Sequence, residues 1–125
     1  GNRIEAIPGP PASITALTAS GLPTDRFIFE GFLPHKKGRK AKLTRLSAIE
    51  ATVIFYESPK RIVRTLKDIL EFMGDRPAVI GRELTKFHEE MIRGNVSKLL
   101  SHFTQKTPRG EFVIMIGKDD PNVYF

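Results

Sequence analysis

The sequence contains no cysteine among its 125 residues. This absence excludes disulfides, thiolate zinc sites, iron–sulfur clusters and cysteine nucleophiles within these residues. It also fits a reducing compartment, so we expect a cytoplasmic location. No apolar run approaches the roughly 18 residues that a membrane-spanning helix needs, so we expect no membrane partner.

Motifs of several enzyme classes are also absent. None of the ten glycines is spaced as Gly-x-Gly, so there is no dinucleotide fingerprint, and no Gly-Lys-Ser/Thr loop for nucleotide phosphates occurs. The missing Gly-x-Ser-x-Gly elbow weighs against an α/β-hydrolase. His88 and Glu89 begin like a zinc-protease motif, but Ile92 stands where the second histidine belongs. The other histidines, His35 and His102, lie far away in the sequence, so we expect no metal site.

The positive charge is concentrated in one segment. The chain has 20 Lys and Arg against 14 Asp and Glu, a net charge of +6. Because six bases lie in ten residues without an acid, the remaining 14 bases balance the 14 acids. Such a segment predicts a local polyanionic partner, since Lys and Arg neutralise phosphates without reading sequence. The alternative is a helix face whose charges are only solvated. The six basic residues of the segment are Lys36, Lys37, Arg39, Lys40, Lys42 and Arg45.

Length and periodicity predict the fold class. A chain of 125 residues with 40% hydrophobic and 27% charged residues has the material of one globular domain. Helical spacing occurs at about 11–20, 39–49, 60–73 and from Asn95 onward. Strand-like runs are Arg26 to Phe32, Ala51 to Tyr56, Ala78 to Arg82, Glu90 to Arg93 and Glu111 to Ile116. We therefore expect a single compact α/β domain, with a mixed, roughly five-stranded sheet flanked by about four helices.

Two of these strands, at 52–56 and 112–116, are apolar without alternation, which predicts that helices cover the sheet and bury both of its faces. Phe27, Phe29 and Phe32 belong to the first strand-like run. Their place in a strand favours packing in the core over stacking on nucleic-acid bases.

The helix at 60–73 carries the clearest end signals. Ser58 is expected as its N-cap and Pro59 as its first helical residue. Gly74 is expected to take the left-handed conformation just past its end.

Three loops at strand ends are candidate ligand sites, because open α/β sheets bind ligands there. Residues 7–11 form a stiff turn in which Gly9 allows close approach to a ligand. Residues 56–61 offer free backbone N–H groups and two cations. The polar segment 82–90 could supply a proton acceptor and orienting cations. Each loop also has a purely structural interpretation: residues 7–11 as a rigid turn, residues 56–61 as the start of a well-capped helix, and residues 82–90 as a solvated loop with internal salt bridges.

Together these segments closely resemble the ribosomal RNA small subunit methyltransferase I family, in the tetrapyrrole methylase superfamily. The resemblance runs in order from about Ile4 to Gly117. It implies a cytidine 2′-O-ribose methyltransferase that uses S-adenosylmethionine (SAM) on small-subunit (16S) rRNA. The matching motifs are Pro8 to Ala12, Ala16 to Phe27, Phe29 to Pro34, Ile54 to Arg61, and Arg82 to Glu90.

Only the second half of such an enzyme is matched. The family has two α/β domains with the methyl donor between them. The resemblance therefore implies that residues 1–118 are a C-terminal domain lacking its own N-terminal domain, with 119–125 as a tail. We expect the fragment to be inactive alone, and the full-length enzyme to form a homodimer and to bind the small ribosomal subunit.

The sequence departs from the family pattern at two positions. Pro11 stands where Ser is more frequent, and Lys60 stands where His is common.

The resemblance also implies site residues. Implied donor-binding residues are Pro8, Gly9, Tyr56, Glu57, Thr85, Gly110, Glu111 and Phe112. Candidate catalytic residues are Glu83, His88 and Glu89 as bases, with Lys86 orienting the substrate. Candidate RNA-binding residues are Lys36, Lys37, Arg39, Lys40, Lys42, Arg45, Lys60, Arg61 and Arg82.

Other functions remain open at this stage. They are a non-catalytic RNA-binding module, a dimerisation domain, and a methyltransferase domain acting on a porphyrin-like ring. The basic segment favours a polyanion over the porphyrin-like ring.

Overall fold

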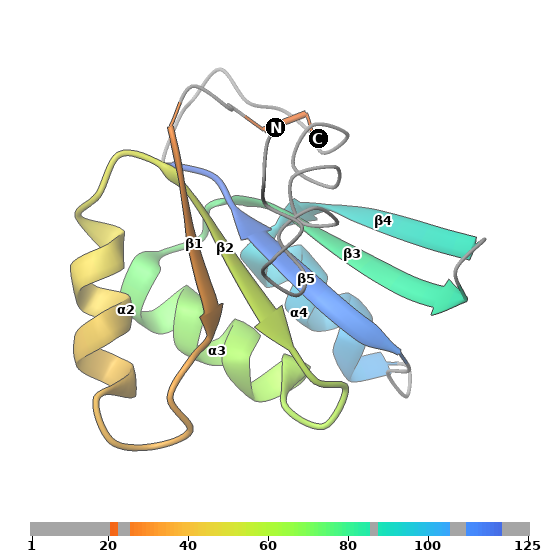
Figure 1. Ribbon diagram of the computed structural model, residues 1–125, viewed down its shortest axis with the longest axis horizontal. Coiled ribbons are helices and arrows are strands. Elements are labelled where there is room, and N and C mark those ends of the chain that lie inside the picture. Colours follow the sequence, from red (N-terminus) through yellow and green to blue (C-terminus); the bar gives the residue numbers. More distant parts are fainter. Residues whose placement is uncertain (1–20, 23–25, 86–87, 106–109, 119–125) are drawn as a thin grey trace, which may run out of the picture.

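A computed structural model describes residues 21–22, 26–85, 88–105 and 110–118 (Figure 1). The helix expected at 11–20, the turn at 7–11 and the tail at 119–125 lie outside these residues. The elements follow the expected order of strands and helices. They are β1 (Phe27–Phe32), α2 (Arg39–Ser47), β2 (Thr52–Glu57), α3 (Ile62–Met73), β3 (Pro77–Thr85), β4 (His88–Asn95), α4 (Val96–Gln105) and β5 (Glu111–Ile116).

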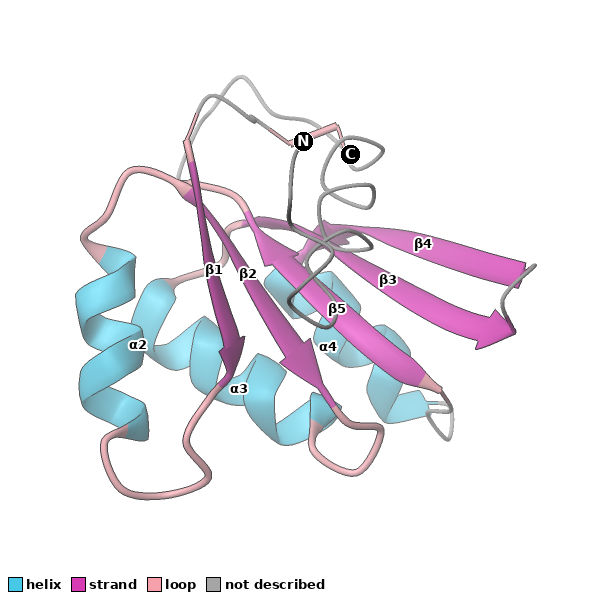
Figure 2. Cartoon of the chain, viewed as in Figure 1, coloured by secondary structure: helices cyan, strands magenta, loops and turns pink. Residues whose placement is uncertain are grey.

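The five strands form one mixed sheet in the order β1-β2-β5-β3-β4. Strands β1 and β2 are parallel and are connected through α2, whereas the β2–β5, β5–β3 and β3–β4 pairs are antiparallel. The three described helices lie on one face of this sheet (Figure 2). This arrangement confirms the predicted α/β class and the mixed five-stranded sheet.

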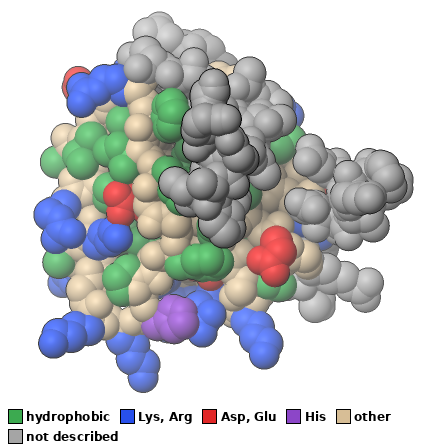
Figure 3. Space-filling model, in the orientation of Figure 1, with side chains coloured by type: hydrophobic (Ala, Val, Ile, Leu, Met, Phe, Trp, Pro, Cys, Tyr) green, Lys and Arg blue, Asp and Glu red, His purple; other side chains and the backbone are tan. Residues whose placement is uncertain are grey.

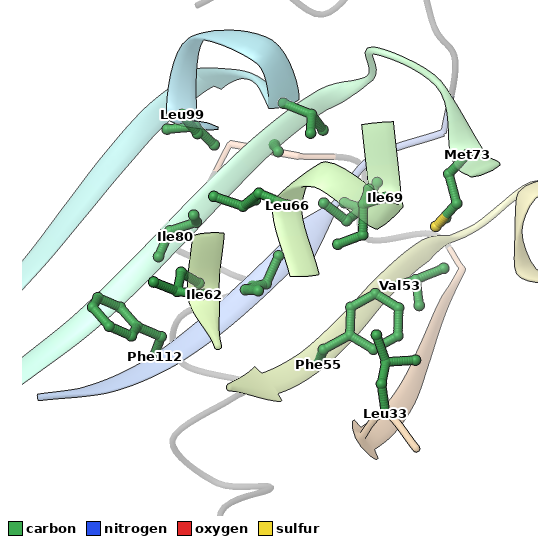
Figure 4. Packing of buried hydrophobic residues seen from close by; sticks show 14 of the residues in the cluster. Leu33, Val53, Phe55, Ile62, Leu66, Ile69, Met73, Ile80, Leu99 and Phe112 are labelled. Atoms are coloured by element: carbon green, nitrogen blue, oxygen red, sulfur yellow. The ribbon is translucent and has the colours of Figure 1, made fainter. Parts of the chain in front are cut away.

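The main core lies between these helices and the sheet. In α3, Ile62, Leu66 and Ile69 recur at helical spacing and are fully buried against inward residues of the strands, such as Phe55 and Ile80 (Figure 4). Each such side chain contributes about 1.5 to 3 kcal/mol when it is removed from water. The apolar stripe of α3 therefore fixes this helix across the middle of the sheet.

Helix α2 packs beside α3 through a narrower stripe. Leu43 and Leu46 are 0% and 4% exposed, and Arg39 is buried on the same face. Gly38 precedes the helix with φ +81°, and its carbonyl accepts the N–H of Lys42 at 2.9 Å. The basic segment is thus a helix with one buried side rather than a free arm.

The opposite face of the sheet has its own buried cluster. Ile54, Val79 and Met115 point away from the helices and pack together with Leu22. This explains why the central strands do not alternate between apolar and polar residues: both of their faces are buried, as predicted, although the described helices cover only one of them. The packing at Gly117 is close, because a Cβ there would come within 2.9 Å of Leu22 Cδ2.

Two expectations about α3 need correction. The helix begins at Ile62, and its N-cap residue is Arg61, with no side-chain cap hydrogen bond. Ser58 instead begins a turn in which the Arg61 N–H donates to its carbonyl at 3.1 Å. Gly74 has the expected positive φ of 96°, but its ψ of 176° is not left-handed helical.

The expectation that the β1 phenylalanines belong to the core is also wrong. Phe27, Phe29 and Phe32 are 44%, 37% and 60% exposed. The physical reason is the position of β1, which lies at the edge of the described sheet and pairs there with β2 alone among the described strands.

Candidate functional site

The sheet topology brings the predicted site segments to one edge. Strands β1, β2 and β3 end there, and the antiparallel partners β4 and β5 begin there. This edge lies toward the bottom and right of the sheet in Figure 1, and we call it the site edge. It collects the turn at 58–61, the ends of the β3–β4 hairpin, the entry to β5 and the start of the basic helix α2. Segments far apart in sequence therefore line one edge of the sheet.

Among the donor-binding candidates, Tyr56 and Glu57 end β2 and pair with Val113 and Phe112 of β5. Phe112 faces the helices, is 1% exposed and packs its ring edge-on against Phe103, so only its backbone is available to a ligand.

The other donor-binding candidates lie at the ends of β3 and β5. Gly110 precedes β5 with φ +87°, a conformation that side chains rarely adopt, and Glu111 beside it is exposed. Thr85 ends β3 at the same edge, whereas Pro8 and Gly9 lie outside the described residues.

The carboxylate of Glu57 turns into the protein. Its side chain is 4% exposed, one oxygen accepts the Ser58 N–H at 2.8 Å, and the other accepts the Thr65 hydroxyl at 2.6 Å. Buried carboxylates need such partners because desolvation is costly. Glu57 therefore holds the 58–61 turn, whereas the ring of Tyr56, the preceding residue, packs against Phe29 and Phe32 of β1.

Arg39 completes this network. Its guanidinium donates to Asp68 at 2.6 Å, to the Thr65 hydroxyl at 2.7 Å and to the Pro34 carbonyl at 3.0 Å, and its side chain is 5% exposed. A guanidinium that is buried and paired in this way is not presented to a phosphate. We therefore assign Arg39 a structural role and leave it out of the basic surface proposed below.

The remaining basic residues divide into paired and exposed groups. Lys42 forms an ion pair with Glu30 of β1 at 2.8 Å, although its own segment contains no acid. Lys60 is exposed, and Arg61 is half-buried, with a guanidinium nitrogen 3.4 Å from the Ser58 hydroxyl. The exposed cations of the segment, which form no ion pair with any residue described, are Lys36, Lys37, Lys40 and Arg45.

The loop that carries Lys36 and Lys37 is held in place by two arginines. Arg39 donates to the Pro34 carbonyl, and Arg64 of α3 donates to the His35 carbonyl at 3.0 Å. Local sequence rules do not indicate this role of Arg64, because the hydrogen bond joins residues 29 positions apart in the chain. Preorganising the loop lowers the entropy lost when its cations bind a ligand.

The catalytic candidates lie on the β3–β4 hairpin. Glu83 is opposite Glu89 of β4 and also opposite Glu111 of β5, so three glutamates occupy one cross-strand row. Thr85 is paired with His88 at the hairpin end, and Lys86 lies outside the described residues.

Arg82 stands next to this row. Its guanidinium forms an ion pair with Glu90 at 2.6 Å, while its buried Nε has no hydrogen-bond partner among the residues described.

The described ranges contain no group of three His, Asp or Glu that could hold a metal ion. They also contain no helix long and apolar enough to span a membrane.

The chain is a methylase domain by its sequence: it belongs to the tetrapyrrole (corrin/porphyrin) methylase family, whose model matches residues 1–100. Within that family, the chain is similar to the ribosomal RNA small subunit methyltransferase I of Thermotoga maritima, with 47% identity over 120 residues covering 95% of this chain and 54% of the relative. The corresponding protein of Mesorhizobium japonicum is 49% identical over 120 residues, 94% of this chain and 41% of the relative. The chain thus spans about half the length of these curated relatives.

Solved structures share the fold. A cobalt precorrin-4 methyltransferase of cobalamin biosynthesis matches with a TM-score of 0.62 and 20% identity, over 85% of this chain and 48% of that one. A uroporphyrin-III C-methyltransferase from Thermus thermophilus, complexed with S-adenyl homocysteine, matches with a TM-score of 0.53 and 17% identity, over 80% of this chain and 48% of that one. At these identities the likeness establishes the fold of the described domain.

Proposed function

We propose that this chain is the C-terminal half of a SAM-dependent methyltransferase that acts on a cytidine ribose 2′-hydroxyl of small-subunit rRNA. The observation that carries the proposal is the site edge, where the donor-side segments meet a cluster of exposed cations. The similarity to rRNA small subunit methyltransferases I supports the substrate class, and the exposed lysines suit the phosphates of an RNA.

The residues present fit a methyl donor with an adenine and an amino-acid end. Backbone at the strand ends is accessible there: Gly110 has a positive φ, and α3 begins with no side-chain cap. Bound in this place, the donor supplies an activated methyl group on a positively charged sulfur. Tyr56, the backbone of 58–61 and the entry to β5 would hold the donor, while the rigid Glu57–Thr65 contact keeps the turn in place.

The reaction breaks the carbon–sulfur bond and forms a carbon–oxygen bond to the ribose. The sulfur keeps the bond's electron pair and becomes neutral, and the hydroxyl proton passes to a base or to water. Alignment of the two reactants can supply about 7 to 11 kcal/mol of the barrier. A base would add a factor of about 10² to 10⁴, and Glu83, His88 and Glu89 are the candidates on this half.

The proposal has consequences for the isolated chain and for its setting. Because the chain spans about half of its relatives, the donor site would be completed by the other half, and the chain alone would not transfer methyl groups. Acting on small-subunit rRNA implies a cytoplasmic location, and we expect a homodimer from the family resemblance.

The test is methyl transfer by the full-length protein that contains this chain. It would be incubated with labelled SAM and small ribosomal subunits lacking the modification, and the rRNA digested to nucleosides. We expect label in 2′-O-methylcytidine, and none when the 125-residue chain is used alone. Label on a porphyrin-like ring but not on rRNA would contradict the proposal.

A further inference from the structure

Strand β1 presents aromatic rings to solvent beside the basic loop. Phe32 is 60% exposed and Phe29 is 37% exposed, and both contact the ring of Tyr56 at centroid distances of 5.6 and 5.2 Å. A single exposed hydrophobic residue needs no explanation, but a cluster on one surface marks a binding site. We call Phe29, Phe32 and Tyr56 the aromatic cluster.

A β-bulge builds this cluster. Phe29 pairs with Ile54, but Gly31 pairs with Phe55 and Phe32 with Tyr56, so the register shifts by one residue. In a regular strand Phe29 and Phe32 would point to opposite faces. The extra residue, together with the φ of +69° at Gly31, places both rings beside Tyr56 on the face away from the helices.

Two exposed cations follow the aromatic cluster along the chain. Lys36 and Lys37 are exposed and follow Phe32 by four and five residues, so their Cα atoms lie within about 14 to 18 Å of its Cα. The one acid of β1, Glu30, is neutralised by Lys42. Figure 3 shows hydrophobic side chains gathered over this part of the sheet face, with Lys and Arg along its left and lower rim.

We propose that the aromatic cluster is a stacking platform for an unpaired base of the RNA substrate, with Phe32 as the ring that meets the base. This deepens the proposed function and rests on it. Aromatic rings beside a positively charged groove are the arrangement by which proteins hold single-stranded nucleic acid. Tyr56 supports Phe32 from one side, and Lys36 and Lys37 are placed for the flanking phosphates. Recognition therefore requires an unpaired nucleotide rather than a regular duplex.

The experiment measures the affinity of the chain for a short unstructured RNA and for a duplex of the same length, at several salt concentrations. Phe32→Ala should weaken binding to the single strand about five- to 140-fold, the range that base–aromatic stacking provides, and leave duplex binding unchanged. The salt dependence should stay the same, since no charge is removed. Phe32→Tyr should retain the affinity.

Two further variants separate the contribution of the Phe32 ring from that of the cations. Phe27→Ala removes another exposed ring, at the far end of β1, and should bind as the wild type does. The double variant Lys36→Ala, Lys37→Ala should lower the slope of log affinity against log salt by about 1.4 for single strands, at 0.7 per contact.

Each other outcome overturns the proposal. If the Phe32→Ala variant binds the single strand as tightly as the wild type does, or loses as much affinity for the duplex as for the single strand, Phe32 does not stack on a base. Either result leaves the proposed rRNA methylation unaffected. A change in sedimentation without a change in RNA affinity would assign the aromatic cluster to a contact between copies of the chain. If the wild-type chain and the full-length protein bind no RNA, the proposed function fails as well.

Discussion

The hydroxyl of Thr65 lies 2.6 Å from a carboxylate oxygen of Glu57, and this buried contact joins helix α3 to the end of strand β2. The same hydroxyl accepts a hydrogen bond from Arg39 at the start of α2. One side chain thus connects the element that carries the basic surface to the strand end that is proposed to hold the methyl donor. The geometry of the site edge depends on this small polar network.

Replacing Thr65 by Val keeps the shape of the side chain but removes the hydroxyl. The Glu57 carboxylate and one Arg39 N–H would each lose a partner, so we expect a loss of about 1 to 3 kcal/mol in the free energy of unfolding. Urea denaturation measures this loss. Thr65→Ser, which keeps the hydroxyl, is the control, and equal stability of the Val variant and the wild type would show that the network contributes nothing.

Arg39 should behave as a structural residue although it lies among lysines. Arg39→Met leaves the Asp68 carboxylate without its cation, and we expect a destabilisation of about 3 kcal/mol in urea denaturation. Lys37→Ala, two residues earlier in the chain and exposed, should leave stability unchanged within about 0.5 kcal/mol. The reverse ranking of the two variants would return Arg39 to the RNA-binding surface.

Gly31 should tolerate a side chain poorly because of its backbone rather than its surroundings. A Cβ there would meet only Phe29 Cε2, at an ordinary 3.9 Å, but the φ of +69° is unfavourable for an L-residue. Gly31→Ala should cost about 1 to 2 kcal/mol in thermal or urea unfolding, and Gly31→Asn less, since Asn visits this conformation more readily. Equal losses for the two variants would show that strain at φ is not the cause.

The glutamate row should affect the chemical step. In the full-length enzyme, Glu83→Gln or Glu89→Gln is expected to lower the single-turnover rate of methyl transfer at least tenfold, with donor and RNA affinity nearly unchanged, because a base contributes about 10² to 10⁴. Glu71→Gln, an exposed change on α3, is the control. Wild-type rates for both variants of the row would place the base elsewhere or show that none is needed.

The fold was predictable because local signals and burial agreed. Apolar runs located β2 and β5, and the stripe of α3 was readable from Ile62, Leu66 and Ile69. The start of α3 was not, because Ser58 is an ordinary N-cap residue whose turn is instead fixed by the Glu57 carboxylate beneath it. That contact depends on Thr65, which local sequence rules do not connect to Glu57.

The site was predictable as a set of segments but not as a set of side chains. Charge density marked the start of α2 without separating buried Arg39 from exposed Lys37, since burial depends on how α2 packs on α3. The exposure of Phe32 was missed because it follows from the edge position of β1 and from the register shift at Gly31. Neither feature is visible in the composition of the strand.

Photochemical cross-linking of the full-length protein to small ribosomal subunits, with identification of the cross-linked peptides, tests most directly the claim that RNA approaches at the site edge. We predict cross-links to rRNA within residues 29–42, which hold the exposed ring of Phe32 and the cations of the loop, and their loss in the Phe32→Ala and Lys36→Ala, Lys37→Ala variants. Cross-links confined to α4, or none to rRNA, would contradict the account.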